Sequence, residues 1–134
     1  MAKKQRQRGC ACGSGLSRAQ CCGRFVDGHA DAPTAEALMR SRYTAFAEQN
    51  ADYLLATWHP EHRPSELHFA PELRWLGLQI LHCEQGQPGD QQGVVEFIAR
   101  AKHPAQPAHR QQERSYFSFS DGRWWYCTGT VIEA

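Results

Sequence analysis

CACGSGLSRAQCCG, residues 10–23, decides how the N-terminal part of this 134-residue chain folds, because it brings four cysteines close together. Cys10 and Cys12 point the same way in an extended chain, so both can bind one ion. Cys21 and Cys22 are adjacent, and they converge on the same ion only in a turn or in the first turn of a helix. Four thiolates complete the tetrahedral shell of a structural zinc ion. We therefore predict a closed zinc site with these four ligands.

Glycines around the cysteines suit a chain that wraps tightly around an ion. Gly13, Gly15 and Gly23 permit positive φ and can aim N–H groups at sulfur. Disulfides are the first competing interpretation, but no secretory signal accompanies the six cysteines, and a bridge between adjacent cysteines is strained. Iron–sulfur clusters usually have wider ligand spacings. Zinc is therefore favoured, and Cys83 and Cys127, in apolar strand patterns, are interpreted as buried apolar residues.

Basic charge is concentrated at the N-terminus. Residues 1–26 hold six Lys or Arg and no acid, which leaves 9 of the 15 basic residues and all 14 acidic residues for the rest of the chain. Four thiolates around a divalent zinc carry a charge of −2 and offset part of this excess. The segment from Lys3 to Arg8 is compatible with a disordered, solubilising tail or with a tail that contacts RNA, a ribosome or an acidic protein surface.

Two helices are predicted after a short linker. Pro33 is tolerated in the first turn of a helix, and Thr34 and Glu36 suit the N-terminal end. Apolar residues then recur with a helical period to about Gln49. Asn50 is expected to cap a second, shorter helix that ends before Pro60. Arg42 falls in the middle of the apolar stripe, so its charge needs a partner. Arg40 projects from the flank of the same helix and is expected to stay in water.

Strands are predicted from Leu73 onward, where apolar residues recur with a period of two. Loops at 85–92 and 103–108 and the two-residue turn Asp121-Gly122 divide this region into four strands. Helices followed by consecutive antiparallel strands predict an α+β fold with one sheet folded over a long helix. In the first strand, we expect Leu76, Leu78 and Ile80 to lie on one face and Trp75, Gln79 and Cys83 on the other.

The cysteine stretch resembles the SEC-C motif, a zinc-binding module also found at the C-terminal tail of the SecA preprotein translocase ATPase. Residues 32–43, 53–60 and 75–78, with Glu113-Arg114-Ser115 and Gly122-Arg123-Trp124, resemble the YchJ-like family of uncharacterised bacterial proteins. This resemblance covers nearly the whole chain. It implies a zinc module at residues 1–26 and a nuclear transport factor 2-like domain at residues 32–134, in which a curved sheet and helices form a cone around a pocket.

A cone of this kind can hold a ligand, so the polar residues expected to face its interior are candidate pocket residues. An ion pair between Arg42 and a sheet carboxylate would fix helix against sheet. No Ser-His-Asp, His-Asp or paired-carboxylate pattern is legible from the spacing, so no catalytic residue is assigned and a scaffold is favoured over an enzyme. The candidate pocket residues are Arg42, Trp58, Glu96, Glu113 and Arg114, with Glu96 or Glu113 as the partner of Arg42.

Three functional hypotheses follow. The first is a small cytoplasmic interaction protein in which structural zinc orders a basic face for an acidic protein or a ribonucleoprotein surface. The second is an enzyme or ligand-binding protein that takes a small molecule into the cone. The third is nucleic-acid binding through the basic N-terminus, which predicts steep salt dependence. No apolar run is long enough to span a membrane. Metal removal is expected to disorder residues 1–26 and to leave residues 32–134 folded.

Overall fold

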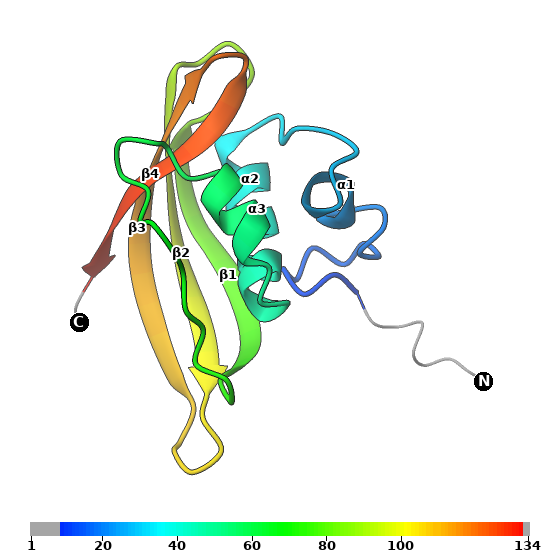
Figure 1. The fold of residues 1–134 in the computed structure, drawn as a ribbon, viewed down its shortest axis with the longest axis vertical. Coiled ribbons are helices and arrows are strands. Elements are labelled where there is room, and N and C mark those ends of the chain that lie inside the picture. Colours follow the sequence, from blue (N-terminus) through cyan, green and yellow to red (C-terminus); the bar gives the residue numbers. More distant parts are fainter. Residues whose placement is uncertain (1–8, 133–134) are drawn as a thin grey trace.

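The computed structural model describes residues 9–132, so the basic residues Lys3, Lys4, Arg6 and Arg8 lie outside the described part of the chain. Helices come first and four strands follow, as the sequence predicts (Figure 1). No helix within residues 9–132 has the length and apolarity needed to cross a membrane. The elements are α1 (Gly23–Val26), α2 (Ala35–Ala47), α3 (Ala51–Ala56), β1 (Arg74–Gln85), β2 (Gln92–Lys102), β3 (His109–Ser120) and β4 (Arg123–Ile132).

Side-chain caps start the two longer helices. Asn50 is the predicted cap, whereas Thr34 caps α2, so that the helix begins after Pro33 and not with it. The Thr34 hydroxyl accepts a hydrogen bond from the backbone N–H of Ala37 at 3.0 Å, and Asn50 Oδ1 accepts one from that of Tyr53 at 3.0 Å. Each cap satisfies a backbone donor that has no partner inside its helix. Helix α2 ends two residues before the predicted Gln49, which adopts a left-handed φ of 57°.

The four strands form one antiparallel sheet in the order β1-β2-β3-β4, so each strand pairs with its neighbour in sequence. The loop at 103–108 has the predicted limits. Asp121 and Gly122 both have positive φ, 53° and 79°, as the tight turn between two twisted strands requires. The predicted α+β class and strand order are confirmed.

The predicted facing of β1 is wrong because the strand contains two irregularities. Register shifts occur between Trp75 and Gly77 and between Ile80 and His82, so one residue is unpaired at each point. An extra residue reverses the alternation of faces, and the second one restores it. Residues from both predicted faces of β1 therefore pack against the same core: Trp75, Leu78, Ile80 and Cys83.

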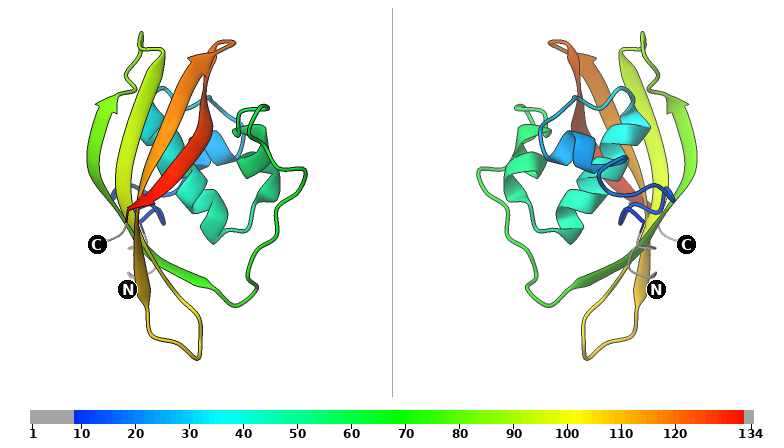
Figure 2. Two further views of the ribbon diagram at one scale, coloured as in Figure 1. Left: turned by 90° about the vertical axis from the view of Figure 1, so that its left-hand side faces the viewer. Right: turned by 90° about the vertical axis from the view of Figure 1, so that its right-hand side faces the viewer.

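The curved sheet wraps around α2, which lies between the sheet and the N-terminal segment (Figures 1 and 2). Leu38 and Met39 of α2, Phe97 of β2 and Trp124 of β4 are buried in this interface. The core does not stop at the helix. The four N-terminal cysteines and Phe25 belong to the same buried cluster, so residues 10–25 pack on the rest of the fold rather than apart from it.

Two glycines hold the start of α2 against the β1–β2 turn. The Ala35 N–H donates to the Gly86 carbonyl at 2.9 Å. A Cβ on Gly93 would lie 2.6 Å from Gly86 Cα and 2.9 Å from Ala35 Cβ, closer than atoms in a packed core can approach. This contact sets how closely the helix approaches the sheet.

Gly93→Ala is expected to lower the free energy of unfolding by about 1 to 3 kcal/mol, because the added methyl group must push the turn away from Ala35. Chemical denaturation measures this loss. Gly77→Ala is the matched control, since a Cβ there meets only a guanidinium nitrogen of Arg100 at 3.7 Å. A control as destabilised as Gly93→Ala would attribute the loss to general strand effects instead of crowding at α2.

Candidate metal centre and cavity

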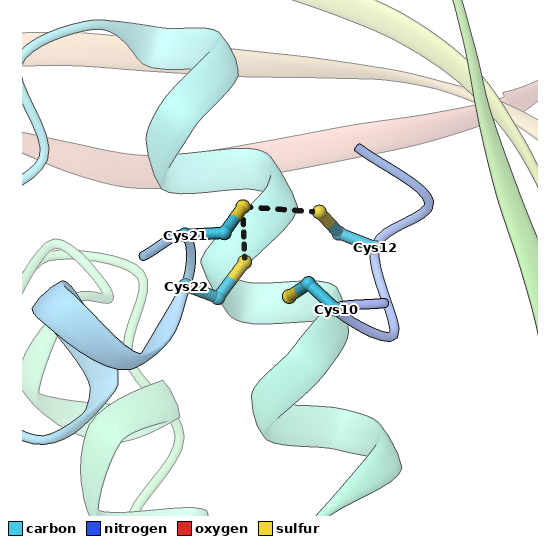
Figure 3. A group of neighbouring side chains, drawn as sticks. All are labelled: Cys10, Cys12, Cys21 and Cys22. Carbon is cyan, nitrogen blue, oxygen red and sulfur yellow. Dashed lines mark hydrogen bonds between the residues drawn. The ribbon is translucent and has the colours of Figure 1, made fainter. Parts of the chain in front are cut away.

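The four N-terminal cysteines converge on one point (Figure 3). Their Sγ atoms all lie within 4.8 Å of one another, with 3.6 Å between Cys12 and Cys21 and 3.9 Å between Cys21 and Cys22. A tetrahedral zinc ion with Zn–S bonds of about 2.3 Å has its sulfurs about 3.8 Å apart. All four residues are buried, with Cys12 at 0% and Cys22 at 1% exposure. The donor set therefore fits a thiophilic ion in size and chemistry.

A tight loop presents the first pair of thiols. The Cys10 N–H donates to the Leu16 carbonyl at 2.7 Å, and the Gly13 N–H donates to the Cys10 carbonyl at 3.0 Å. Gly13 and Gly15 have φ values of 83° and 90°, which a residue with a side chain adopts only under strain. The two glycines thus turn the chain back so that Cys10 and Cys12 face the second pair.

The start of α1 presents the second pair. Cys22 is the residue that precedes the helix, and its carbonyl accepts from the N–H groups of Phe25 and Val26 at 2.9 Å each. Gly23 is required here, because a Cβ at this position would lie 2.7 Å from the Arg18 carbonyl oxygen. Of the two predicted placements, a turn or the first turn of a helix, Cys21 and Cys22 take the first, in a turn directly before α1.

Polar side chains surround the thiols. Ser14 Oγ donates to Cys21 Sγ at 3.1 Å, and Thr44 Oγ1 lies 3.5 Å from Cys10 Sγ. Arg40 Nη1 donates to the Cys12 carbonyl at 3.0 Å and lies 3.7 Å from Cys12 Sγ. Arg40 is therefore not left in water as predicted, because the N-terminal segment folds back over this flank of α2. Position on a helix alone does not reveal such a contact.

The thiols differ in how readily they lose a proton. The pKa of Cys12 is lowered to about 4, first because Cys22 donates a hydrogen bond to its sulfur, and further because Arg40 and Ser14 lie close. The same hydrogen bond raises the pKa of Cys22, and burial raises that of Cys21. The Arg40 cation and the Ser14 hydroxyl thus favour a thiolate within the cluster. Binding of a metal ion releases the protons of the others.

Arg40→Met is expected to weaken metal binding about 10-fold to 100-fold, because it removes a cation and a donor from the surroundings of Cys12. Competition with a chromogenic chelator measures the affinity. Arg63→Met is the control, since the exposed Arg63 guanidinium lies outside the cysteine segment and contacts the Trp58 carbonyl rather than sulfur. An equal loss in both variants would mean that overall charge, and not the contact with Cys12, sets the affinity.

A cavity of about 290 Å³ lies between the helices and the concave face of the sheet. Three of the five candidate pocket residues, Arg42, Trp58 and Glu113, line it. Glu96 and Arg114 do not. They pair with each other at 3.0 Å on the other face of the sheet, because neighbouring residues along a strand point to opposite faces. The lining residues are Met39, Arg42, Tyr43, Phe46, Trp58, Trp75, Phe97, Ala99, His109, Gln111, Glu113, Ser115 and Tyr126.

Arg42 does not form the predicted ion pair with Glu96 or Glu113, and no carboxylate among residues 9–132 lies within 4.0 Å of it. Its Nη1 instead donates to the Leu54 carbonyl and to Thr57 Oγ1, each at 2.7 Å. Burial lowers the pKa of this arginine to about 10. The residue is 2% exposed and remains charged at neutral pH.

Two aromatic rings that contact each other pack against this cation. The Arg42 guanidinium lies 4.3 Å from the centre of the Tyr126 ring and 5.1 Å from that of Trp58. Backbone hydrogen bonds of 2.8 Å join Tyr126 to Thr57 and His59, which fixes the two rings against each other. Neutral carbonyl and hydroxyl oxygens and aromatic faces thus surround Arg42 in place of the predicted carboxylate. The helical pattern of the sequence does not predict these contacts.

Comparison with known proteins identifies similar chains over nearly the full length. Residues 34–129 match the family described as YchJ, middle NTF2-like domain. The chain is 50% identical over 133 residues to a UPF0225 protein of Chromobacterium violaceum, covering 96% of this chain and 97% of the other. It is 48% identical over 124 residues to a UPF0225 protein of Streptomyces coelicolor, with 92% and 96% covered.

Two solved structures have the same fold. A SEC-C motif containing protein from Rhodopseudomonas palustris, determined in solution, superposes with a TM-score of 0.83 at 35% identity, covering 94% of this chain and 100% of the other. A SEC-C motif containing protein from Psychrobacter arcticus, determined by crystallography, gives a TM-score of 0.75 at 27% identity, with 95% and 84% covered. Both the cysteine segment and the sheet domain therefore have counterparts of known structure.

Proposed function

This chain belongs to the YchJ-like family, and on that premise we propose that it is a zinc-binding interaction protein whose metal is structural. The observation that carries the proposal is the convergence of four buried thiols within 4.8 Å. Cys10, Cys12, Cys21 and Cys22 provide four ligands and leave no position for a substrate, as in structural zinc sites. The ion would order the N-terminal segment and would take no part in chemistry.

The zinc module at residues 1–26 would be an attached unit of the domain at residues 32–134. Three contacts support a fixed attachment. Thr44 and Arg40 of α2 approach Cys10 and Cys12, and Arg18 donates to Glu48 at the end of α2 at 2.6 Å. The same Arg18 donates to Asp27 at 2.8 Å, within the segment that follows α1. These contacts would hold the module in one orientation once the ion is bound.

The partner would be an acidic protein surface. Arg18 is neutralised by two carboxylates of the chain itself, whereas Arg24 is exposed, with its guanidinium 4.7 Å from the centre of the Phe25 ring. Four further basic residues, from Lys3 to Arg8, directly precede Cys10 in sequence. Zinc would thus anchor the base of a positively charged segment. Its charge favours an acidic partner and speeds association at low salt.

The test compares what the intact protein and its variants retain from a cell extract. The first variant replaces Lys3, Lys4, Arg6 and Arg8 with glutamine. The control replaces three exposed sheet arginines, Arg74, Arg100 and Arg110, with glutamine. We expect one acidic protein to be retained by the intact protein and the control and lost from the first variant. Zinc content, measured on the same samples, should be about one ion per chain in all three.

Two results would contradict the proposal. Absence of metal from freshly purified intact protein would contradict the proposal that the protein holds a structural zinc ion. Retention of the same partners by all three proteins would show that the basic segment from Lys3 to Arg8 does not bind the partner. Nuclease-sensitive retention of RNA would instead support nucleic-acid binding, with a steep dependence on salt.

A further inference from the structure

The cavity between α2 and the sheet has an apolar end and a polar end. Met39 and Phe46 of α2 and Trp75 and Phe97 of the sheet line the apolar end, while Arg42 and Glu113 supply opposite charges. A volume of about 290 Å³ is near the lower end of the range for small-molecule sites, about 300 to 1,000 Å³. Mostly apolar walls with a few polar groups are typical of such sites.

Two residues that line the cavity, Trp58 and Arg42, have unused hydrogen-bond donors. Trp58 lines the cavity, and its Nε1–H is buried without any hydrogen-bond partner among the residues that the structure describes. Leaving such a donor unpaired costs about 1 to 3 kcal/mol. Arg42 uses Nη1 for Leu54 and Thr57, while its Nε and Nη2 make no hydrogen bond to residues 9–132. An acceptor atom in the cavity would satisfy donors that the fold leaves open.

Glu113 provides an acceptor on the β3 side. Ser115 Oγ donates to its Oε2 at 3.3 Å and Gln111 Nε2 donates to its Oε1 at 3.2 Å. The carboxylate lies over Gly129 of β4, where a Cβ would collide with it and would lie 3.1 Å from the Tyr126 hydroxyl. The absence of a side chain at Gly129 thus makes room for Glu113 beside Tyr126, and so at the polar end.

The separation of the Arg42 and Glu113 charges determines which ligand charge the cavity can accept. Arg42 and Glu113 both line the cavity, yet they form no ion pair within 4.0 Å. A carboxylate ligand would gain from Arg42 and be repelled by Glu113, and a cationic ligand would meet the reverse. A neutral group with an acceptor and a donor side by side satisfies both residues without leaving a buried charge uncompensated.

We propose that this cavity is a binding site for a small neutral molecule with an aromatic or aliphatic body and a carboxamide-like head. The carbonyl oxygen accepts from Trp58 Nε1 and from the free nitrogens of Arg42, and the N–H group donates to Glu113. The apolar body fills the end lined by Met39, Phe46, Trp75 and Phe97. This binding is independent of the zinc site, so either proposal can fail without the other.

Three probes of one shape and different charge test the assignment: 2-naphthamide, the 2-naphthoate anion and the 2-naphthamidinium cation. Each is titrated into the intact ¹⁵N-labelled protein, and the indole N–H resonances are followed. We expect the Trp58 resonance to move with 2-naphthamide, at an affinity at least tenfold higher than for either charged probe. No movement of that resonance at saturating probe, or tighter binding of a charged probe, overturns the proposal.

Variants at the polar end separate the roles of its residues. Glu113→Gln should raise the affinity for 2-naphthoate relative to 2-naphthamide at least tenfold, because the repulsion is lost. Trp58→Phe should weaken 2-naphthamide at least tenfold. Trp125→Phe is the control and should bind unchanged, since the Trp125 Nε1–H donates to the Ser120 carbonyl at 3.0 Å and the residue does not line the cavity. An unchanged amide-to-acid ratio in Glu113→Gln contradicts the assignment even if Trp58→Phe fails to fold.

Discussion

Cys22→Ser is expected to abolish stoichiometric zinc binding and to lower the free energy of unfolding by more than about 4 kcal/mol, among the largest effects of a single substitution. Cys22 is 1% exposed, directly precedes α1 and lies in the buried cluster that continues into α2. A serine oxygen is a poor replacement for thiolate at a thiophilic site. Structural zinc contributes about 10 to 16 kcal/mol in small zinc modules, so the loss of one ligand outweighs the change in packing.

Metal analysis after dialysis against a mild chelator, followed by thermal unfolding, measures both effects. We expect close to no zinc in Cys22→Ser and about one ion per chain in the natural protein. Cys127→Ser is the matched control. That cysteine is half-buried in β4, 3.4 Å from Ser118 Oγ and outside the cluster, so zinc content should not change. A Cys22→Ser protein that keeps its ion would show that the four thiols are not the ligand set.

The same experiment examines the division into a zinc module and a larger domain. Amide resonances of the sheet, residues 74–132, should remain dispersed in Cys22→Ser, while those of residues 9–26 collapse. The backbone hydrogen bonds of the sheet and of α2 do not involve the cysteine segment, which is the reason for this expectation. Cooperative loss of all resonances would mean that the chain is one folding unit.

Arg42→Ala is expected to lower the free energy of unfolding by about 3 to 5 kcal/mol, the second large effect. The substitution removes the donor to the buried Leu54 carbonyl and to Thr57 Oγ1, and it opens a space beside the Trp58 and Tyr126 rings. An unpaired buried carbonyl costs about 1 to 3 kcal/mol, and the lost packing of the side chain adds to it. Denaturant titration followed by tryptophan fluorescence measures the change.

Two further variants show which property of Arg42 accounts for the loss of stability in Arg42→Ala. Arg42→Met keeps most of the volume and should recover part of the stability lost in Arg42→Ala, since it fills the space but donates no hydrogen bond. Arg100→Ala removes an exposed arginine of β2 and should change stability by less than about 0.5 kcal/mol. Equal stability of Arg42→Ala and Arg100→Ala would show that the buried guanidinium does not hold α2 against α3.

Local signals in the sequence predicted most of the fold. The caps at Thr34 and Asn50 and the Asp121-Gly122 turn each depend on neighbouring residues, so the chain itself discloses them. The irregularities of β1 are different. The residues skipped between Trp75 and Gly77 and between Ile80 and His82 are defined only by pairing with β2, which a pattern within one strand does not contain.

The functional-site residues likewise include some that the sequence predicted and some that it did not. The cysteine spacing predicted that the four thiols converge, as they do, but it did not predict Arg40, which reaches Cys12 only because residues far apart in sequence meet on α2. For the cavity, the prediction that both Glu113 and Arg114 face the interior was wrong for Arg114, because neighbours along β3 face opposite sides of the sheet. The sequence did not predict the Leu54 carbonyl as a partner of Arg42, because every residue has a backbone carbonyl and the side chains do not indicate which one accepts.

The core continues from the cysteines into α2, so a metal ion bound as proposed would link the lifetime of the protein to metal supply. A ligand that binds only the folded state stabilises it by RT ln(1 + [L]/Kd), so each tenfold rise in free zinc above the Kd adds about 1.4 kcal/mol. With zinc bound as proposed, resistance to proteolysis rises with the free zinc of the surroundings, and scarcity of zinc exposes the apolar residues beneath the N-terminal segment. The abundance of the protein would then report the zinc status of the cell.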